Sequence, residues 1–396
     1  MLSFDEAREK IMHGIACLDT EKVPLSEASG RVLGAQLTAQ SPLPPRNYSA
    51  MDGYALRLAD LSGEGPWSLP VIGESRTGHP TPTLSPASVV RIFTGATLPA
   101  GADTVEMQEN VTRRGDNASF EQRPKLGRHI RRAGEDLATG SVALEAGTRI
   151  GPFALSLLGA LDLGELEVRR LPRVHILATG DELRDPGSPA TPGSIPESNG
   201  LTIAALAKQA GAEVTRWPRS GDDRDATTEA VKSALKDCDL LVTIGGVSVG
   251  DHDHVRPALE AAGVNLEFWK VAIKPGKPLV LGNSGATRVL GLPGNPVSAM
   301  ITFALFGLPL LRALQGCSRI SPSLLRGTLT CSMTQKPGRH GFYAARLDGD
   351  QLTPLSNQSS GSTVNLAWAD VLIQLPAEAD GANAGDAVDY LRIAEL

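Results

Sequence analysis

A glycine-rich loop between an apolar run and two acids is the stretch best suited to chemistry. Residues 240–244 are apolar and of strand length, and Gly245-Gly246-Val247-Ser248-Val249-Gly250 follow them, ahead of Asp251 and Asp253. Glycines let a ligand approach the backbone, and a strand, a glycine loop and a helix start together hold an anion on backbone N–H groups. Carboxylates beside an expected phosphate suggest a bridging divalent cation, with Mg²⁺ as the first choice. The alternative is a tight turn with solvated acids.

Carboxylates also follow two other predicted strands. Glu182 comes after residues 173–179, and Asp222 comes after residues 213–217. In open α/β sheets a ligand lies outside the carboxyl ends of the strands, so these acids should converge with Asp251 and Asp253. Carboxylates that converge repel one another unless a cation lies between them. The Pro293-Gly294-Asn295-Pro296 loop follows a fourth strand and should line the same place.

Three lysines supply the opposite charge. Lys270, Lys274 and Lys277 lie in and beside a Lys-Pro-Gly-Lys-Pro segment, and they suit a phosphorylated ligand. The alternative is a solvated basic loop. The formal net charge of the chain is -6. This balance argues against a general nucleic-acid binder, so an anionic ligand requires such a local basic cluster.

The elements that must position these groups alternate between strand and helix from 171 to 316. This pattern is typical of a doubly wound α/β domain. A helix over 201–210 should be capped by Ser198 or Asn199. The apolar segment 299–311 is too short to span a bilayer and should be a buried helix. The other elements expected are strands at 173–179, 213–217, 240–244 and 279–282, and helices at 225–236 and 254–262.

The flanking regions have other patterns. We expect a helix over 3–19, started by Ser3 and Glu6, and a second helical piece over 23–37. Strands at 89–93 and 104–108 indicate a β-rich module. A helix begins at Pro152. Residues 317–396 alternate like strands and indicate a small β-barrel, with a hairpin turn at Asp348-Gly349.

Three polar residues outside the α/β region are candidates for a site. Asp52 precedes a glycine, Thr94 ends a strand, and Asp136 follows Gly134-Glu135. The residues alone favour an ordinary turn for Asp52 and a capping hydroxyl for Thr94, and they leave Asp136 equally as a cap or a site residue.

Composition bounds the class of protein. A chain of 396 residues should form about two to four domains. Hydrophobic residues make up 41% and charged residues 21%, which is ordinary for a soluble globular protein. The four cysteines are far apart, so we expect free thiols in a reducing compartment. With no signal-peptide pattern and no membrane span expected, the sequence predicts a cytoplasmic protein.

Eight motifs in order resemble the molybdopterin molybdenumtransferases, which are related to the E domain of gephyrin. The resemblance extends over essentially the whole chain. The motifs are Ser49-Ala50-Met51-Asp52-Gly53-Tyr54-Ala55, Thr94-Gly95-Ala96, Gly101-Ala102-Asp103, Gly134-Glu135-Asp136, Ala178-Thr179-Gly180-Asp181-Glu182-Leu183, Gly245-Gly246-Val247-Ser248-Val249-Gly250, Lys274-Pro275-Gly276-Lys277-Pro278 and Pro293-Gly294-Asn295-Pro296-Val297-Ser298.

The resemblance implies an activity and its partners. Adenylyl-molybdopterin and molybdate would react, with Mg²⁺, to give molybdenum cofactor and AMP. The chain would form a homodimer with shared sites and meet other proteins of molybdenum cofactor biosynthesis, with no role for nucleic acid or a membrane. A non-catalytic binding or scaffold protein, a tungsten-specific paralogue and a phosphate-bond hydrolase are the alternatives. Four retained acids favour the enzyme, because a mere binder of a polyanion gains nothing from them.

The resemblance also implies roles and domain limits. Glu182, Asp222 and Asp253 would surround the cation. The partner subunit would contribute Asp52, Thr94 and Asp136 to the catalytic set. The substrate-binding residues would be Gly245, Gly246, Ser248, Gly250, Lys270, Lys274, Lys277, Pro293 and Pro296. The domains would be an N-terminal helix (1–20) packing with the α/β domain, a linking module (21–40 and 131–170), a β-rich module (41–130), an α/β molybdopterin-binding domain (171–316) and a C-terminal β-barrel (317–396).

The chain departs from the family pattern at two positions. Asp251 stands where the family often has Glu, and Ala344 replaces a usual arginine. Arg346, two residues further on, is the candidate replacement for that arginine.

Overall fold

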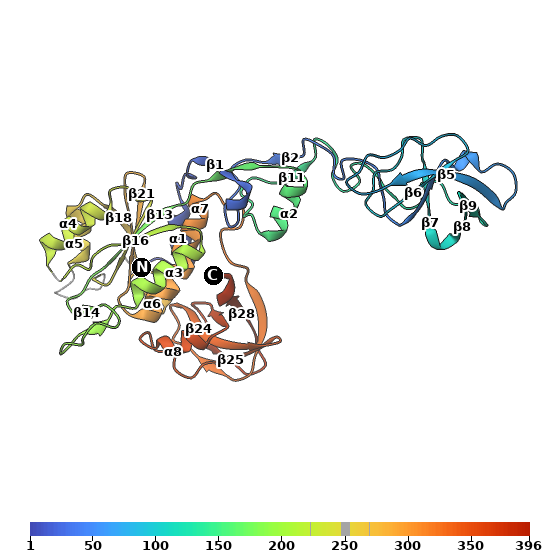
Figure 1. The fold of residues 1–396 in the computed structure, drawn as a ribbon. Helices are drawn as coiled ribbons and strands as arrows, with labels where there is room; N and C mark the ends of the chain where they lie inside the picture. Colours follow the sequence, from blue (N-terminus) through green and yellow to red (C-terminus); the bar gives the residue numbers. More distant parts are fainter. Residues whose placement is uncertain (222, 247–253, 269) are drawn as a thin grey trace.

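The computed structural model describes the whole chain except residues 222, 247–253 and 269. The molecule is elongated (Figure 1). A body made of an α/β sheet and a β-barrel lies at one end, a β-rich module lies at the other, and a slender linking region joins them.

The body is built on a six-stranded sheet. Its strand order is β16-β13-β17-β21-β20-β18. The first four strands run parallel; β20 pairs antiparallel with β21, and β18 pairs antiparallel with β20 at the edge. The central strand β17 is buried at every position, as its apolar run predicts. The strands are β13 (Arg173–Ala178), β16 (Glu213–Arg216), β17 (Leu240–Ile244), β18 (Asn265–Phe268), β20 (Val280–Ser284) and β21 (Thr287–Leu292).

Helices cover both faces of this sheet, which confirms the doubly wound prediction. Helices α4 (Arg224–Ala234) and α5 (Val255–Ala261) pack together, and their buried residues share a cluster with one face of the sheet. Helix α3 (Asn199–Gln209) and the helices described next share the larger core on the other face. That core continues into the barrel through Phe342, so the sheet and the barrel are packed as one body.

Helix α1 (Phe4–Met12) starts as predicted but is shorter. The side chain of Ser3 accepts from the backbone N–H of Glu6, and the Glu6 carboxylate accepts from the N–H of Ser3 at 2.7 Å. The predicted continuation to residue 19 is wrong, because Gly14 adopts a φ of 67°, a conformation that stops a helix. The buried face of α1 nevertheless packs into the larger core.

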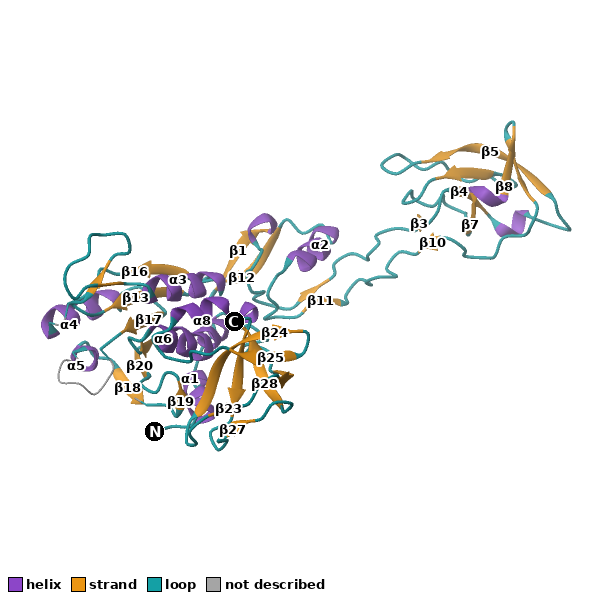
Figure 2. Cartoon of the chain, turned by 90° about the horizontal axis from the view of Figure 1, so that it is seen from below, coloured by secondary structure: helices purple, strands orange, loops and turns teal. Residues whose placement is uncertain are grey.

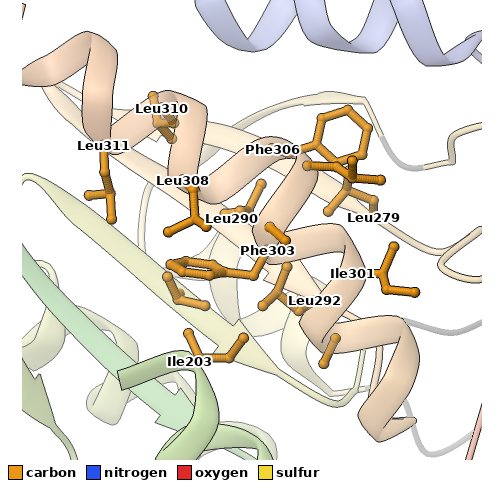
Figure 3. Packing of buried hydrophobic residues seen from close by; sticks show 14 of the residues in the cluster. Ile203, Leu279, Leu290, Leu292, Ile301, Phe303, Phe306, Leu308, Leu310 and Leu311 are labelled. Atoms are coloured by element: carbon orange, nitrogen blue, oxygen red, sulfur yellow. The ribbon is translucent and has the colours of Figure 1, made fainter. Parts of the chain in front are cut away.

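The apolar segment after β21 forms a buried helix that is longer than expected. Helix α6 (Pro296–Thr302), a π-helical turn (Phe303–Gly307) and α7 (Leu308–Leu314) run on continuously. The helical segment has 19 residues and is long and apolar enough to cross a membrane, so the prediction that it is too short to do so is wrong. It is nevertheless 83% buried, because its leucines and phenylalanines pack against the sheet (Figure 3). It is therefore a core helix, as predicted.

The C-terminal region is a closed barrel of five strands. They follow the order β24-β25-β22-β28-β26, and β26 pairs back with β24. The hairpin predicted around Asp348-Gly349 joins β24 to β25, with its two-residue turn one position later, at 349–350. Strand β19 (Ile273–Lys274) runs parallel to the start of β24 and attaches the lysine loop to the barrel. The barrel strands are β22 (Leu325–Leu329), β24 (His340–Asp348), β25 (Gln351–Pro354), β26 (Val371–Leu375) and β28 (Ala387–Arg392), with helix α8 (Thr363–Trp368) beside them.

The linking region consists of paired strands. Strand β1 (Thr20–Pro24) pairs with β12 (Glu165–Arg169), so the helix expected over 23–37 is wrong beyond a single 3-10 turn. The reason is a partner strand far along the chain that local pattern cannot reveal. Two further pairs continue the region, and Figure 2 shows the extended passes leading to the β-rich module. These are β2 (Leu37–Thr38) with β11 (Val142–Leu144), and β3 (Tyr48–Ser49) with β10 (Ile130–Arg131). Helix α2 (Pro152–Ala160) begins at its proline, as predicted.

The β-rich module is a six-stranded sheet with small cores of its own. The two strands predicted from sequence are present as β6 and β7. The strands are β4 (Gly53–Leu56), β5 (Trp67–Ser75), β6 (Val89–Ile92), β7 (Thr104–Met107), β8 (Val111–Arg114) and β9 (Asn117–Phe120).

Candidate functional site

A cleft of about 500 Å³ lies at the carboxyl ends of β13, β17 and β21. This is the edge at which open α/β sheets bind ligands. The loops that follow the three strands form much of its wall, and the start of α3 and Pro278 complete it. The lining includes Gly245, Gly246, Glu182, Pro293 and Pro296, so the structure brings these predicted site residues together.

Two glycines let the strand ends approach one another. Gly245 and Gly246 have φ values of 88° and 59°. A Cβ on Gly245 would lie 2.9 Å from the carbonyl oxygen of Thr179, and one on Gly246 would lie 2.4 Å from the side chain of Val255. A larger residue at position 245 would therefore push away the end of β13, and a larger residue at position 246 would push away the start of α5.

Glu182 is the acid of the predicted set that lies in the described part of the cleft. Its exposed carboxylate folds back over Gly180, where a Cβ would come within 2.5 Å of it. The backbone N–H of Gly180 donates to the carbonyl of Ser220 at 3.2 Å, so the ends of β13 and β16 are joined beside it. A carboxylate is the kind of ligand that Mg²⁺ takes in proteins, so Glu182 fits a role in holding that ion.

The other predicted acids and loop residues lie outside the residues that the structure describes. They are Asp222, Ser248, Gly250, Asp251 and Asp253. Among the described residues, no group of three or more His, Cys, Asp or Glu side chains is placed to hold a metal ion.

A buried carboxylate in the cleft wall was missed by sequence reasoning. Glu197 is only 2% exposed, and its carboxylate accepts from Arg216 at 2.7 Å and from the N–H of Gly200 at 2.5 Å. Ser198 stands at the cap position of α3, but its side chain makes no capping hydrogen bond. The predicted cap by Ser198 or Asn199 is therefore wrong, because Glu197 takes that N–H from one position earlier. The only sequence signal was an acid just before the helix.

Asn199 was weighed as a cap and instead spans the cleft wall. Its Nδ2 donates to the carbonyl oxygen of Gly294 at 2.7 Å. Both residues line the cleft. Its Oδ1 is enclosed and has no hydrogen-bond partner.

A second cleft, of about 450 Å³, lies between the lysine loop and the barrel. Lys274 and Lys277 line it, and the Nζ of Lys274 lies 5.5 Å from the ring centre of Tyr343. Pro278 lines both clefts, so they adjoin. Lys270 is not among the residues that line either cleft, and its carbonyl accepts from Leu2 at 3.1 Å. We call this second cavity the lysine cleft.

The cationic side chain that the barrel contributes to the lysine cleft is Arg339, which sequence reasoning missed. Arg346 does not line it, and pairs with Asp370 at 3.6 Å. Ala344 is buried, and its backbone bonds with the side-chain amide of Gln358.

Asp52 and Thr94 meet each other but not the cleft of their own chain. One oxygen of Asp52 accepts from the backbone N–H of Thr94 at 2.7 Å and from its hydroxyl at 2.8 Å. These two bonds, aided by the charge of Arg91, hold the pKa of Asp52 below its ordinary value. Both residues lie in the β-rich module, far from the strand-end cleft (Figure 1).

Asp136 lies beyond β10 in the linking region. It is exposed and paired with Arg131, which also holds Glu135 at 2.6 Å.

Comparison with known proteins gives matches along the whole chain. Residues 2–161 match the MoeA N-terminal region (domain I and II), residues 175–313 a probable molybdopterin binding domain, and residues 326–393 the MoeA C-terminal region (domain IV). The molybdopterin molybdenumtransferase of Haemophilus influenzae is 37% identical over 98% of both chains. Molybdopterin molybdenumtransferase 2 of Mycobacterium tuberculosis is 38% identical over 92% of both.

The fold is also similar to solved structures. The molybdopterin biosynthesis MoeA protein from Pyrococcus horikoshii OT3 superposes with a TM-score of 0.87 at 28% sequence identity. The match covers 99% of this chain and 100% of that one.

Proposed function

The chain belongs to the family of the molybdopterin molybdenumtransferases, and on that premise we propose that it transfers molybdenum to molybdopterin. It is a transferase. The observation that carries this function is the family match over the full chain, together with a cleft at the strand ends of the molybdopterin-binding region. The buried core helix and the relatives' biosynthetic role fit a soluble protein.

We propose that the strand-end cleft takes adenylyl-molybdopterin. Gly245 and Gly246 put no side chain into this part of the wall, so a phosphate could approach the backbone closely there. Glu182, with Asp222 and Asp253, would hold Mg²⁺, and this ion would neutralise phosphate charge when bound. Adenylyl-molybdopterin and molybdate then give molybdenum cofactor and AMP.

We propose that molybdate binds in the lysine cleft. Lys274, Lys277 and Arg339 bring three cations together in a chain whose net charge is -6. No carboxylate is among the described residues that line this cleft, so an anion is the missing partner. Because both clefts share Pro278 in their walls, an oxyanion bound in the lysine cleft would lie next to the pterin substrate.

A homodimer would complete the site. The Asp52–Thr94 pair belongs to the β-rich module, which lies at the other end of the molecule from the body that holds the cleft (Figure 1), and Asp136 follows β10 in the linking region. Helix α2 has one buried residue, Leu158, and its Phe153 is 93% exposed, which leaves an apolar surface uncovered. Burial of α2 against a second copy would let the partner subunit's Asp52 reach the cleft.

Free thiols fit a reducing cytoplasm, which we propose as the location. Two cysteines are buried and two are exposed, and all four are unpaired. Exposed unpaired thiols are typical of proteins kept in a reducing compartment.

The test is AMP release and reconstitution of an apo-molybdoenzyme after incubation with adenylyl-molybdopterin, molybdate and Mg²⁺. The wild-type chain should give both products. Substrate binding without AMP release would favour the non-catalytic alternative.

Mixed dimers test the shared site. An Asp52→Ala chain and a Glu182→Ala chain should each be inactive. After subunit exchange, half of the dimers carry one intact site, so about a quarter of wild-type activity should return. No recovery after verified exchange would contradict a site built from two subunits.

A further inference from the structure

Asn199 links two walls of the strand-end cleft. It is the first residue of α3, and Gly294, 95 residues later, lies in the loop between β21 and α6. The hydrogen bond from Nδ2 to the Gly294 carbonyl therefore fixes the distance between these two elements. Both ends of the bond line the cleft, next to Pro293 and Pro296.

The orientation of the Asn199 amide is determined by its surroundings. A flipped amide would place Oδ1 against the Gly294 carbonyl oxygen, where two acceptors repel. With Nδ2 on Gly294, Oδ1 has no partner although it is enclosed. An enclosed acceptor without a partner is destabilising, so this side chain brings little net stability.

The buried ion pair keeps the base of Asn199 in place. The Glu197 carboxylate holds the N–H of Gly200 and the guanidinium of Arg216 at once. Asn199 lies between Glu197 and Gly200, so the backbone that carries its side chain is held on both sides. Because its backbone is rigid and its side chain is short, Asn199 can hold the Gly294 loop at a fixed distance from α3.

We propose that Asn199 is a positioning residue for the transfer reaction. It holds the Pro293–Pro296 loop at the spacing from α3 that the molybdopterin substrate requires. The inference rests on the proposed function. It concerns the strand-end cleft alone, because the residues that line the lysine cleft do not include Asn199 or Gly294.

The test compares Asn199→Ala with a matched control. Misplacement of a substrate wall by about 1 Å costs as much as hundredfold, so kcat/KM for adenylyl-molybdopterin should fall about ten- to hundredfold. The KM for that substrate should rise, and the KM for molybdate should stay within about twofold. The melting temperature should stay within about 2 °C of wild type, because the enclosed Oδ1 is removed along with the bond.

Two further variants sharpen the result. Asn199→Asp keeps the shape but puts an oxygen where Nδ2 donated, so its loss should at least equal that of Asn199→Ala. Asn283→Ala removes a different side-chain amide hydrogen bond, from Asn283 Nδ2 to the Glu267 carboxylate at 2.8 Å, and Asn283 lines neither cleft. This control should keep kcat/KM within about twofold of wild type.

Wild-type kcat/KM in Asn199→Ala would overturn the proposal. An equal rise in both KM values, in step with a lowered melting temperature, would also overturn it, because that pattern marks a merely structural role. If wild type binds adenylyl-molybdopterin without turnover, the proposed transfer fails. The Kd for adenylyl-molybdopterin then tests the positioning role: it should be about ten- to hundredfold higher in Asn199→Ala than in wild type, and an unchanged Kd would overturn the proposal.

Discussion

Replacement of Lys274 by alanine should weaken oxyanion binding much more than it alters folding. Lys274 ends β19, is half-buried, and faces the lysine cleft beside Lys277 and Arg339. Its Nζ lies 5.5 Å from the ring centre of Tyr343. With no carboxylate among the described lining residues, the ammonium group is free to meet an anionic ligand.

The magnitude follows from these contacts. A charge-assisted contact is worth about 1.5–3 kcal/mol, and about 1.4 kcal/mol is tenfold in affinity, so the Kd for molybdate should rise about 10- to 150-fold. The cation–π contact with Tyr343 is worth about 0.5–1 kcal/mol to the fold. Relief of repulsion from Lys277 and Arg339 offsets part of that loss. The free energy of unfolding should therefore change by less than about 1 kcal/mol.

The assay is calorimetric titration of molybdate at two salt concentrations, with thermal melting of the same samples. Lys274→Arg keeps the charge and should lose less affinity than Lys274→Ala. Lys232→Ala is the matched control, because Lys232 pairs with Glu229 on the surface of α4 and lines neither cleft. A Kd within twofold of wild type in Lys274→Ala, or an equal loss in Lys232→Ala, would refute the assignment of this cleft to the oxyanion.

Two further predictions concern packing and pH. Gly246→Ala should be less stable than Gly285→Ala by about 1–3 kcal/mol in denaturant titration, because both have a φ of 59° but only the first meets a neighbour, the Val255 side chain at 2.4 Å. Equal losses would mean that the close approach is unimportant. Burial lowers the pKa of His340 below its ordinary 6.5, although Asp5 and Glu378 oppose this. The unfolded chain then binds more protons between the lowered pKa and 6.5, so stability is full above 6.5 and falls as the pH falls through that window. His340→Phe should melt with a smaller drop between pH 7 and pH 5 than wild type, and an equal drop would contradict the assignment.

Local patterns in the sequence determined several elements. The apolar run of β17 predicted a strand buried on both sides. Ser3 and Glu6 predicted the start of α1. The turn at Asp348-Gly349 predicted the hairpin in the barrel. Each of these depends on residues within a few positions of one another, so the chain itself carries the information.

Contacts between distant segments needed the tertiary structure. The helix expected over 23–37 does not form, because its start belongs to strand β1, for which β12 supplies a partner about 140 residues later, and a single 3-10 turn follows. Two contacts in the cleft wall also join segments that are distant in sequence, and no repeating pattern of residues predicts them. They are the ion pair of Glu197 with Arg216 and the hydrogen bond from Asn199 to Gly294.

The sequence also named Asp52, Thr94 and Glu182 without their distances. The structure joins the first two by hydrogen bonds and separates both from the third by the length of the linking region. The chemical character of a side chain follows from its residue type, so the sequence was enough to select these residues as candidates. Which groups meet depends on how the strands pair and how the modules are held apart, and only the folded chain decides that.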